Sequence, residues 1–93
     1  MSYRMDFPEL DALSDEQLSR MGFMLADENR RTEGKCITKH RVAFISLTTT
    51  GIVYAPTTQD AVLTLNALRE TGYTAVCYTW IGNCGFGYEE TAL

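Results

Sequence analysis

Apolar residues recur at helical spacing over residues 14–30, which predicts an amphipathic helix. Ser14 precedes the pattern and Gln17 follows three positions later, the arrangement of a capping box. The apolar stripe consists of Leu18, Met21, Met24 and Leu25. Phe23 falls outside this stripe, on the polar side of the helix, and we therefore expect it to be exposed.

Shorter apolar runs predict three strands. Residues 42–47 form an apolar, β-branched run of the kind that is buried on both faces of a sheet. A turn is expected at 49–51, where Gly51 can adopt a positive φ, and residues 52–55 resume strand character until Pro56. Residues 73–81 alternate aromatic, β-branched and small residues, which favours a third strand.

A second helix is predicted over residues 58–71, between the second and third strands. Thr57 is a suitable N-cap with Asp60 three positions later, and Gly72 is a suitable residue just beyond the C-terminal end. The apolar stripe of this helix consists of Ala61, Leu65 and Leu68, with Val62 at its edge.

The order α-β-β-α-β predicts a small α+β domain. A crossover of this length returns the third strand parallel to the second. We therefore expect the strand order 2-1-3, in which the first strand pairs antiparallel with both of its neighbours. This order places the most apolar strand at the centre of the sheet. We expect both helices on one face of this three-stranded sheet. Its edges, 52–55 and 73–81, carry no Lys, which leaves them open to a partner or to a second copy of the chain.

The composition fits a single domain spanning residues 1–93, with an N-terminal segment at 1–13 and a glycine-rich C-terminal loop and tail at 82–93. Apolar residues make up 45% and charged residues 22%, as in globular proteins. Eight basic against twelve acidic residues give a net charge of −4, which excludes a general histone-like or membrane-surface role. No run is long enough to span a membrane, and the first residues do not resemble a signal peptide, so we expect a cytoplasmic protein.

One segment, residues 30–41, is basic and could contact nucleic acid. Its candidate contact residues are Arg30, Arg31, Lys35, Lys39 and Arg41. No aromatic residue is interleaved for base stacking, and basic residues at a helix C-terminus also complement the helix dipole. The sequence therefore disfavours nucleic acid as the main partner, and binding through this segment stays open as an alternative.

The three cysteines and the single histidine do not form a familiar metal motif. Cys36 with His40, and Cys77 with Cys84, lack the tight ligand spacing of structural zinc sites, and we predict no metal and no cofactor. Cys84 lies in the glycine-rich segment 82–87, so a thiol-dependent enzyme that uses Cys84 with His40 as base is a second open alternative.

Exposed aromatic residues point to a protein interface. Phe23 on the first helix and Phe86 and Tyr88 near the C-terminus have acidic neighbours, and Glu16 and Asp27 lie beside Phe23 at helical spacing. Aromatic residues are enriched at interface cores, and a charged surround steers an oppositely charged partner. The alternative is that these residues are structural: Phe23 packs under the N-terminal segment that contains Phe7 and Leu10, and Phe86 caps the end of the sheet.

No set of residues typical of an active site stands out, so we predict a non-enzymatic module that binds a protein. We expect that partner to be basic or to bind nucleic acid. Small, acidic chains of this kind are similar in type, though not in motif, to accessory proteins of phages and mobile elements that inhibit host proteins, including anti-CRISPR proteins. This similarity implies an inhibitor with an anti-defence role.

Overall fold

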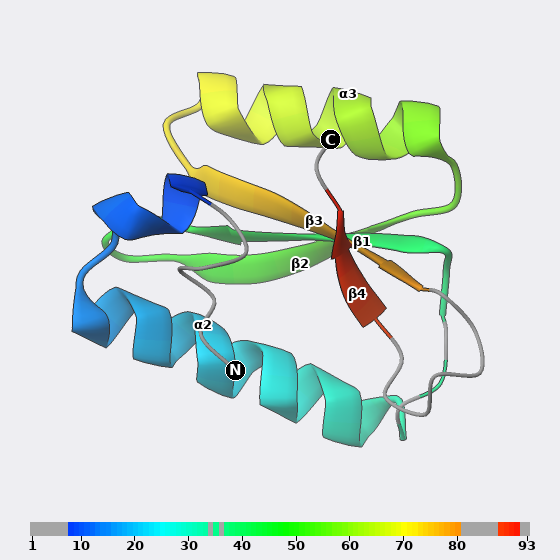
Figure 1. Cartoon of the computed structure of the whole chain (residues 1–93), viewed down its shortest axis with the longest axis horizontal. Coiled ribbons are helices and arrows are strands. Elements are labelled where there is room, and N and C mark those ends of the chain that lie inside the picture. Colours follow the sequence, from blue (N-terminus) through cyan, green and yellow to red (C-terminus); the bar gives the residue numbers. More distant parts are fainter. Residues whose placement is uncertain (1–7, 34, 36, 81–87, 92–93) are drawn as a thin grey trace.

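The fold is a four-stranded antiparallel sheet with helices on both faces (Figure 1). A computed structural model describes residues 8–33, 35, 37–80 and 88–91. The strands are β1 (His40–Ile45), β2 (Thr50–Ala55), β3 (Thr74–Trp80) and β4 (Tyr88–Thr91), in the order β2-β1-β3-β4. The predicted α+β class, element order and strand order 2-1-3 are confirmed, with the most apolar strand inside the sheet.

Two helices and a short 3-10 helix complete the fold: η1 (Pro8–Ala12), α2 (Asp15–Arg31) and α3 (Thr58–Glu70). The Ser14 hydroxyl accepts a hydrogen bond from the Gln17 backbone N–H at 3.2 Å, and the Gln17 side chain accepts one from the Ser14 N–H at 3.0 Å. The Thr57 hydroxyl accepts from the Asp60 N–H at 3.1 Å. Both predicted helix starts are confirmed, and Gly72 after α3 has the expected positive φ of 101°.

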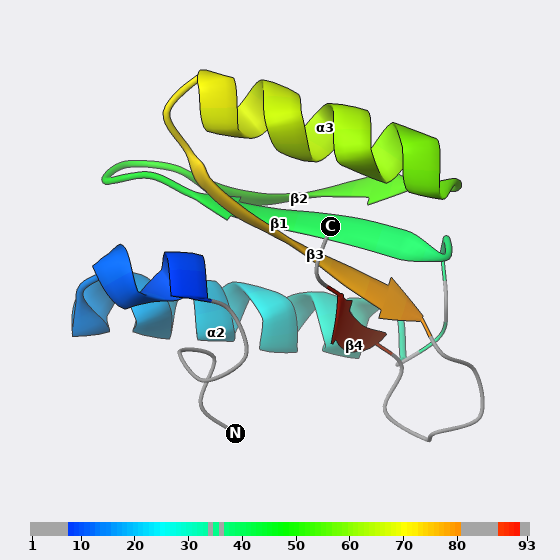
Figure 2. The same cartoon turned by 45° about the horizontal axis from the view of Figure 1, so that its top comes forward.

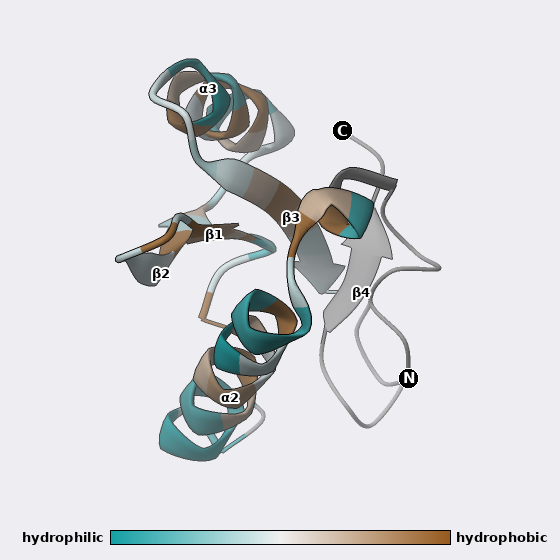
Figure 3. Cartoon of the chain, turned by 90° about the vertical axis from the view of Figure 1, so that its left-hand side faces the viewer, coloured by the Kyte–Doolittle hydropathy of each residue, from teal (hydrophilic) through white to brown (hydrophobic). Residues whose placement is uncertain are grey.

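The helices lie on opposite faces of the sheet, so the prediction that both pack on one face is wrong (Figure 2). The physical reason is that the inner strands are apolar on both faces. On β1, Val42 faces α3 and Ala43 faces α2, and both are fully buried. A sheet with two apolar faces needs a cover on each. Figure 3 shows the two helices on either side of the sheet, each with its hydrophilic residues turned outward.

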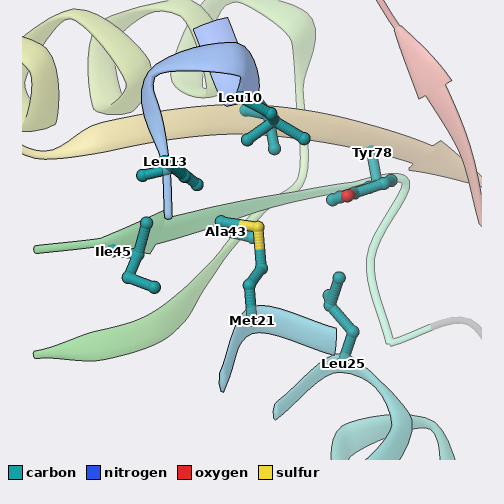
Figure 4. Close-up of a cluster of buried hydrophobic side chains, with 8 residues drawn as sticks. Leu10, Leu13, Met21, Leu25, Ala43, Ile45 and Tyr78 are labelled. Atoms are coloured by element: carbon teal, nitrogen blue, oxygen red, sulfur yellow. The ribbon is translucent and has the colours of Figure 1, made fainter. Parts of the chain in front are cut away.

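The core therefore has two layers. The larger layer lies between the sheet and α2 with η1 (Figure 4), and its buried members are Leu10, Leu13, Met21, Leu25, Ala43, Ile45, Val76 and Tyr78. The smaller layer lies under α3 and consists of Val42, Ala55, Ala61, Leu65, Ala75 and Cys77. The predicted apolar stripes of both helices supply the buried helical residues, because each stripe faces the sheet.

The fourth strand corrects two further predictions. Residues 88–91 were expected to lie in a loop or tail, but they pair with β3, with Trp80 opposite Tyr88 and Cys77 opposite Thr91. Consequently β3 is an inner strand and not an edge. Adjacent acids such as Glu89 and Glu90 are typical of a solvated tail, but pairing satisfies a row of backbone groups along the outer side of β3.

The turn between β1 and β2 comes earlier than predicted. The Ser46 N–H donates to the Thr49 carbonyl at 2.7 Å, and the Ser46 hydroxyl accepts from the Thr48 and Thr49 N–H groups at 3.3 and 3.1 Å. Gly51 is therefore not in the turn. It lies inside β2, directly opposite Phe44.

Candidate protein-interaction surface

The outward side of α2 carries an exposed aromatic residue between two acids. Phe23 is 76% exposed, and Glu16 and Asp27, which lie one to two turns away on the same side, are also exposed. We call these three residues the Phe23 surface. The alternative that Phe23 packs under the N-terminal segment is wrong, because Phe23 points away from the core, in which Leu10 of η1 is fully buried.

Polar contacts fix the position of α2 along the hairpin that β1 and β2 form. Near the start of the helix, the Arg20 guanidinium donates to the carbonyl of Leu47 at 3.0 Å and to that of Ser46 at 3.4 Å. Near its end, the Tyr54 hydroxyl donates to the Glu28 carboxylate at 2.7 Å. These two contacts align α2 with β2 from the turn to the strand's last residues.

The hairpin turn adds a second exposed apolar side chain beside α2. Leu47 is 84% exposed, and its carbonyl is bound by Arg20. The sequence does not indicate either residue as part of this surface. Leu47 ends the apolar run that predicts a buried strand, and Arg20 lies among the polar residues of the helix. No local pattern of residues marks the turn at Ser46.

The basic segment is mostly exposed, but its charges are partly neutralised. Among its predicted contact residues, Arg30, Arg31, Lys35 and Lys39 are exposed. The first three form ion pairs with acids of the same segment or of α2, namely Arg30 with Asp27 at 3.0 Å, Arg31 with Glu28 at 3.3 Å and Lys35 with Glu33 at 3.4 Å. Exposed pairs of this kind compete with phosphate contacts.

Arg41 does not belong to that exposed segment, so its prediction as a nucleic-acid contact is wrong. It is the second residue of β1, only 4% exposed, and its guanidinium carbon lies 5.7 Å from the centre of the Tyr78 ring. A residue of an inner strand whose side chain points under α2 cannot reach a phosphate. The sequence signal, a run of basic residues, does not distinguish a loop from the start of a strand.

His40 and Cys77 both lie on the α3 side of the sheet, with Thr79 next to each. The His40 ring nitrogens lie 2.8 Å from the Thr79 hydroxyl and 3.2 Å from the Thr58 hydroxyl. Burial, with a smaller contribution from Lys39, lowers the pKa of His40 below its ordinary value. Burial raises the pKa of the Cys77 thiol, although a hydrogen bond with Thr79 opposes the shift.

No metal site emerges in the part of the chain that the structure describes, where no three His, Cys, Asp or Glu side chains come together. Four residues named in the sequence analysis can be placed no further. Cys36, Cys84 and Phe86 lie outside the described residues, and Tyr88 is known only as the first residue of β4.

The chain matches no protein-family model, no curated protein and no solved structure. Across the described residues, neither helix has the length and apolar character needed to cross a lipid bilayer. The surfaces described above therefore have to be interpreted from their own chemistry.

Proposed function

We propose that the protein is a non-enzymatic module that binds another protein through the Phe23 surface and so inhibits it. The exposure of Phe23 is the observation that supports this most directly. Transferring a Phe side chain from water into an interface is worth about 1.5–3 kcal/mol. Aromatic residues of this kind are common among the few residues that dominate binding energy.

The charges around Phe23 favour a basic partner. Glu16 and Asp27 flank the ring, and the whole chain carries a net charge of −4. Acidic surroundings accelerate encounter with a positively charged surface and suppress encounter with an acidic one. Proteins that bind nucleic acid present such surfaces, and an inhibitor of the type found among phage and mobile-element proteins, acting in the cytoplasm, would suit this chemistry.

The alternatives have weaker support. Three of the four exposed basic candidates already pair with neighbouring acids, which reduces the case for nucleic acid. A thiol enzyme would need His40 as its base, and both ring nitrogens of His40 lie within hydrogen-bond distance of threonine hydroxyls.

The test is affinity capture of the tagged chain from lysate of its source cell, or of that source's host, with and without nuclease, followed by mass spectrometry. We expect one stoichiometric protein that survives nuclease and is lost from the Phe23→Ala variant. Capture that collapses with nuclease would instead favour the basic segment, and no specific capture would favour thiol chemistry.

The matched control is Leu63→Ala. Leu63 is also a large exposed apolar residue, 61% exposed, but it lies on α3, on the opposite side of the sheet. We expect Leu63→Ala to keep the captured protein and both variants to unfold at the temperature of the wild type. Equal loss from both variants, or loss of stability in Phe23→Ala, would contradict the proposal.

A further inference from the structure

The β2 edge of the sheet lacks the features that normally prevent pairing with another strand. β2 contains no charged residue and no Pro, and all six of its residues pair with β1 in an unbroken register. Its far side faces no other strand among the described residues. At the opposite edge, β4 contains Glu89 and Glu90. Charged or interrupted edges discourage strand addition, so the two edges differ in kind.

The phase of the ladder shows which backbone groups β2 presents on its open side. The Ser46 N–H donates to the Thr49 carbonyl, and bonded and non-bonded pairs alternate along an antiparallel ladder. Gly51 and Val53 therefore bond to β1, whereas Thr50 and Ile52 direct their backbone N–H and carbonyl groups away from it. An added antiparallel strand can pair with β2 if its own outward N–H and carbonyl groups lie opposite those of Thr50 and Ile52.

Along α2, a row of alternating charges runs on the side next to β2. Glu16, Arg20, Asp27 and Arg31 fall within about 60° of one another at 100° per residue, and we call them the charged stripe. Arg20, one member of the stripe, donates to the Ser46 and Leu47 carbonyls, which places this side of the helix toward the hairpin turn that leads into β2.

The charged stripe is complementary to itself when two copies run antiparallel. Glu16 then lies opposite Arg31 of the second copy, and Arg20 opposite Asp27 of the second copy. Both pairs are centred on the same point of the helix, between Phe23 and Met24. A single register therefore places each of the four charges opposite a charge of the other sign. Asp27 and Arg31 also pair with Arg30 and Glu28 of their own chain, so in the dimer these exposed side chains share two partners.

The strands are compatible with a similar register. Arg20 contacts the turn before β2 and Glu28 contacts Tyr54 near its end, so the middle of this helical segment lies level with the part of β2 from Thr50 to Ile52. Pairing β2 with its own copy about Ile52 uses the outward groups of Ile52 at the centre. The two-fold axis of the strands thus passes near the centre of the charged stripe.

We infer that two copies of the chain associate through their β2 strands, antiparallel about Ile52, with their α2 helices side by side. α2 packs on β1 and β2 while η1 packs on β3, so each α2 lies near the open edge. With strands about 4.8 Å apart, the helix axes would lie about 10 Å apart, a normal packing distance. Because both copies use the same surface about a two-fold axis, no copy of this surface is left free, and association stops at a dimer.

This inference goes beyond the proposed function. It places Glu16 and Asp27 opposite Arg31 and Arg20 of the second copy and leaves Phe23, beside that interface, as the contact with a different protein. The mass of the purified chain, measured by light scattering on a size-exclusion column from about 1 to about 500 μM, tests it. We expect twice the chain mass at the upper end, and a monomer at every concentration would overturn the inference.

Charge reversal tests the register. Asp27→Arg alone places like charges opposite Arg20, and Arg20→Asp alone places like charges opposite Asp27, so each should weaken the dimer at least about tenfold. An equimolar mixture of the two variants restores opposite charges at both positions and should form a heterodimer of nearly wild-type affinity. A mixture no tighter than either variant alone would overturn the register.

The second pair guards against a folding defect, since Arg20 also holds the hairpin turn. Glu16→Arg and Arg31→Glu change exposed side chains and should show the same loss alone and recovery when mixed. The outcomes separate the two proposals. A monomer that still captures a different protein through Phe23 overturns this inference alone, and a dimer that captures no other protein overturns the proposed inhibitor alone.

Discussion

The Phe44 ring occupies the space beside Gly51 in which any other residue would place its Cβ. A Cβ at position 51 would lie 2.5 Å from Phe44 Cζ and 2.9 Å from Cε1. The ring also makes an edge-to-face contact with Tyr73, with centroids 5.0 Å apart. A glycine within an edge strand usually weakens the sheet, but Gly51 is covered by an aromatic ring from the neighbouring strand.

The first prediction follows from this contact. Gly51→Ala should lower the free energy of unfolding by about 1–3 kcal/mol, because the Phe44 ring must leave its position against Tyr73. Urea denaturation measures the change. In a Phe44→Leu background the same substitution should cost much less, and additive effects of the two substitutions would contradict the packing argument.

The second prediction concerns two residues with positive φ. Glu33 follows α2 with φ of 57°, a conformation that costs a side chain about 1 kcal/mol and glycine little. Glu33→Gly should therefore stabilise the protein by up to about 1 kcal/mol, measured by thermal or urea unfolding. The exposed pair with Lys35 that it removes contributes little.

Gly72 provides the matched opposite change. Its φ is 101° and a Cβ there would meet no atom within 4 Å, so Gly72→Ala isolates the backbone cost and should destabilise by about 1 kcal/mol. If both substitutions changed stability in the same direction, backbone strain would not be the cause.

The third prediction is a pH dependence of stability due to His40. Its pKa in the folded protein lies below the ordinary value of 6.5, so the unfolded chain binds its proton more readily. As far as His40 is concerned, the free energy of unfolding should be constant well above pH 6.5 and should fall as the pH drops through 6.5 towards the folded pKa. Urea titrations between about pH 7.5 and 5.5 measure it.

His40→Gln is the control for that measurement. It removes the titrating ring and keeps a side chain able to bond with the Thr58 and Thr79 hydroxyls. The variant should show a flatter profile over this pH range than the wild type. Parallel profiles would show that another group is responsible.

The fourth prediction is that Cys77 resists alkylation. Its side chain is buried under α3 and its pKa is raised, so both access and thiolate formation are reduced. In a Cys36→Ser, Cys84→Ser variant, iodoacetamide should modify the native protein at least about a hundredfold more slowly than the urea-unfolded chain. Mass spectrometry of the intact protein follows the reaction, and comparable rates would contradict the described burial.

Local signals predicted the elements well, because each depends on a few neighbouring residues. The Ser14 and Gln17 capping box, the N-cap at Thr57 and the positive φ of Gly72 are all found where their residue types indicate. The exposure of Phe23 followed from helical periodicity alone. It is also the part of the candidate site that the sequence located correctly.

The errors arose where distant segments meet. Nothing near residues 88–91 indicates that β3 lies alongside them, and a basic run gives no sign that Arg41 is already part of an inner strand. The placement of the helices could have been inferred, since a strand predicted to be buried on both faces implies a cover on each. The sequence alone does not relate the complementary charges of α2 to β2, because only the contact of Arg20 with the hairpin turn places that side of the helix beside the hairpin.

The two core layers are separated by a single thickness of sheet, and this affects how the protein can evolve. The layer under α3 has its own buried residues and shares with the other layer only the backbone of the strands. The outward residues of α2, such as Glu16, Phe23 and Asp27, belong to neither layer. They can therefore change in evolution without altering the packing on either face of the sheet.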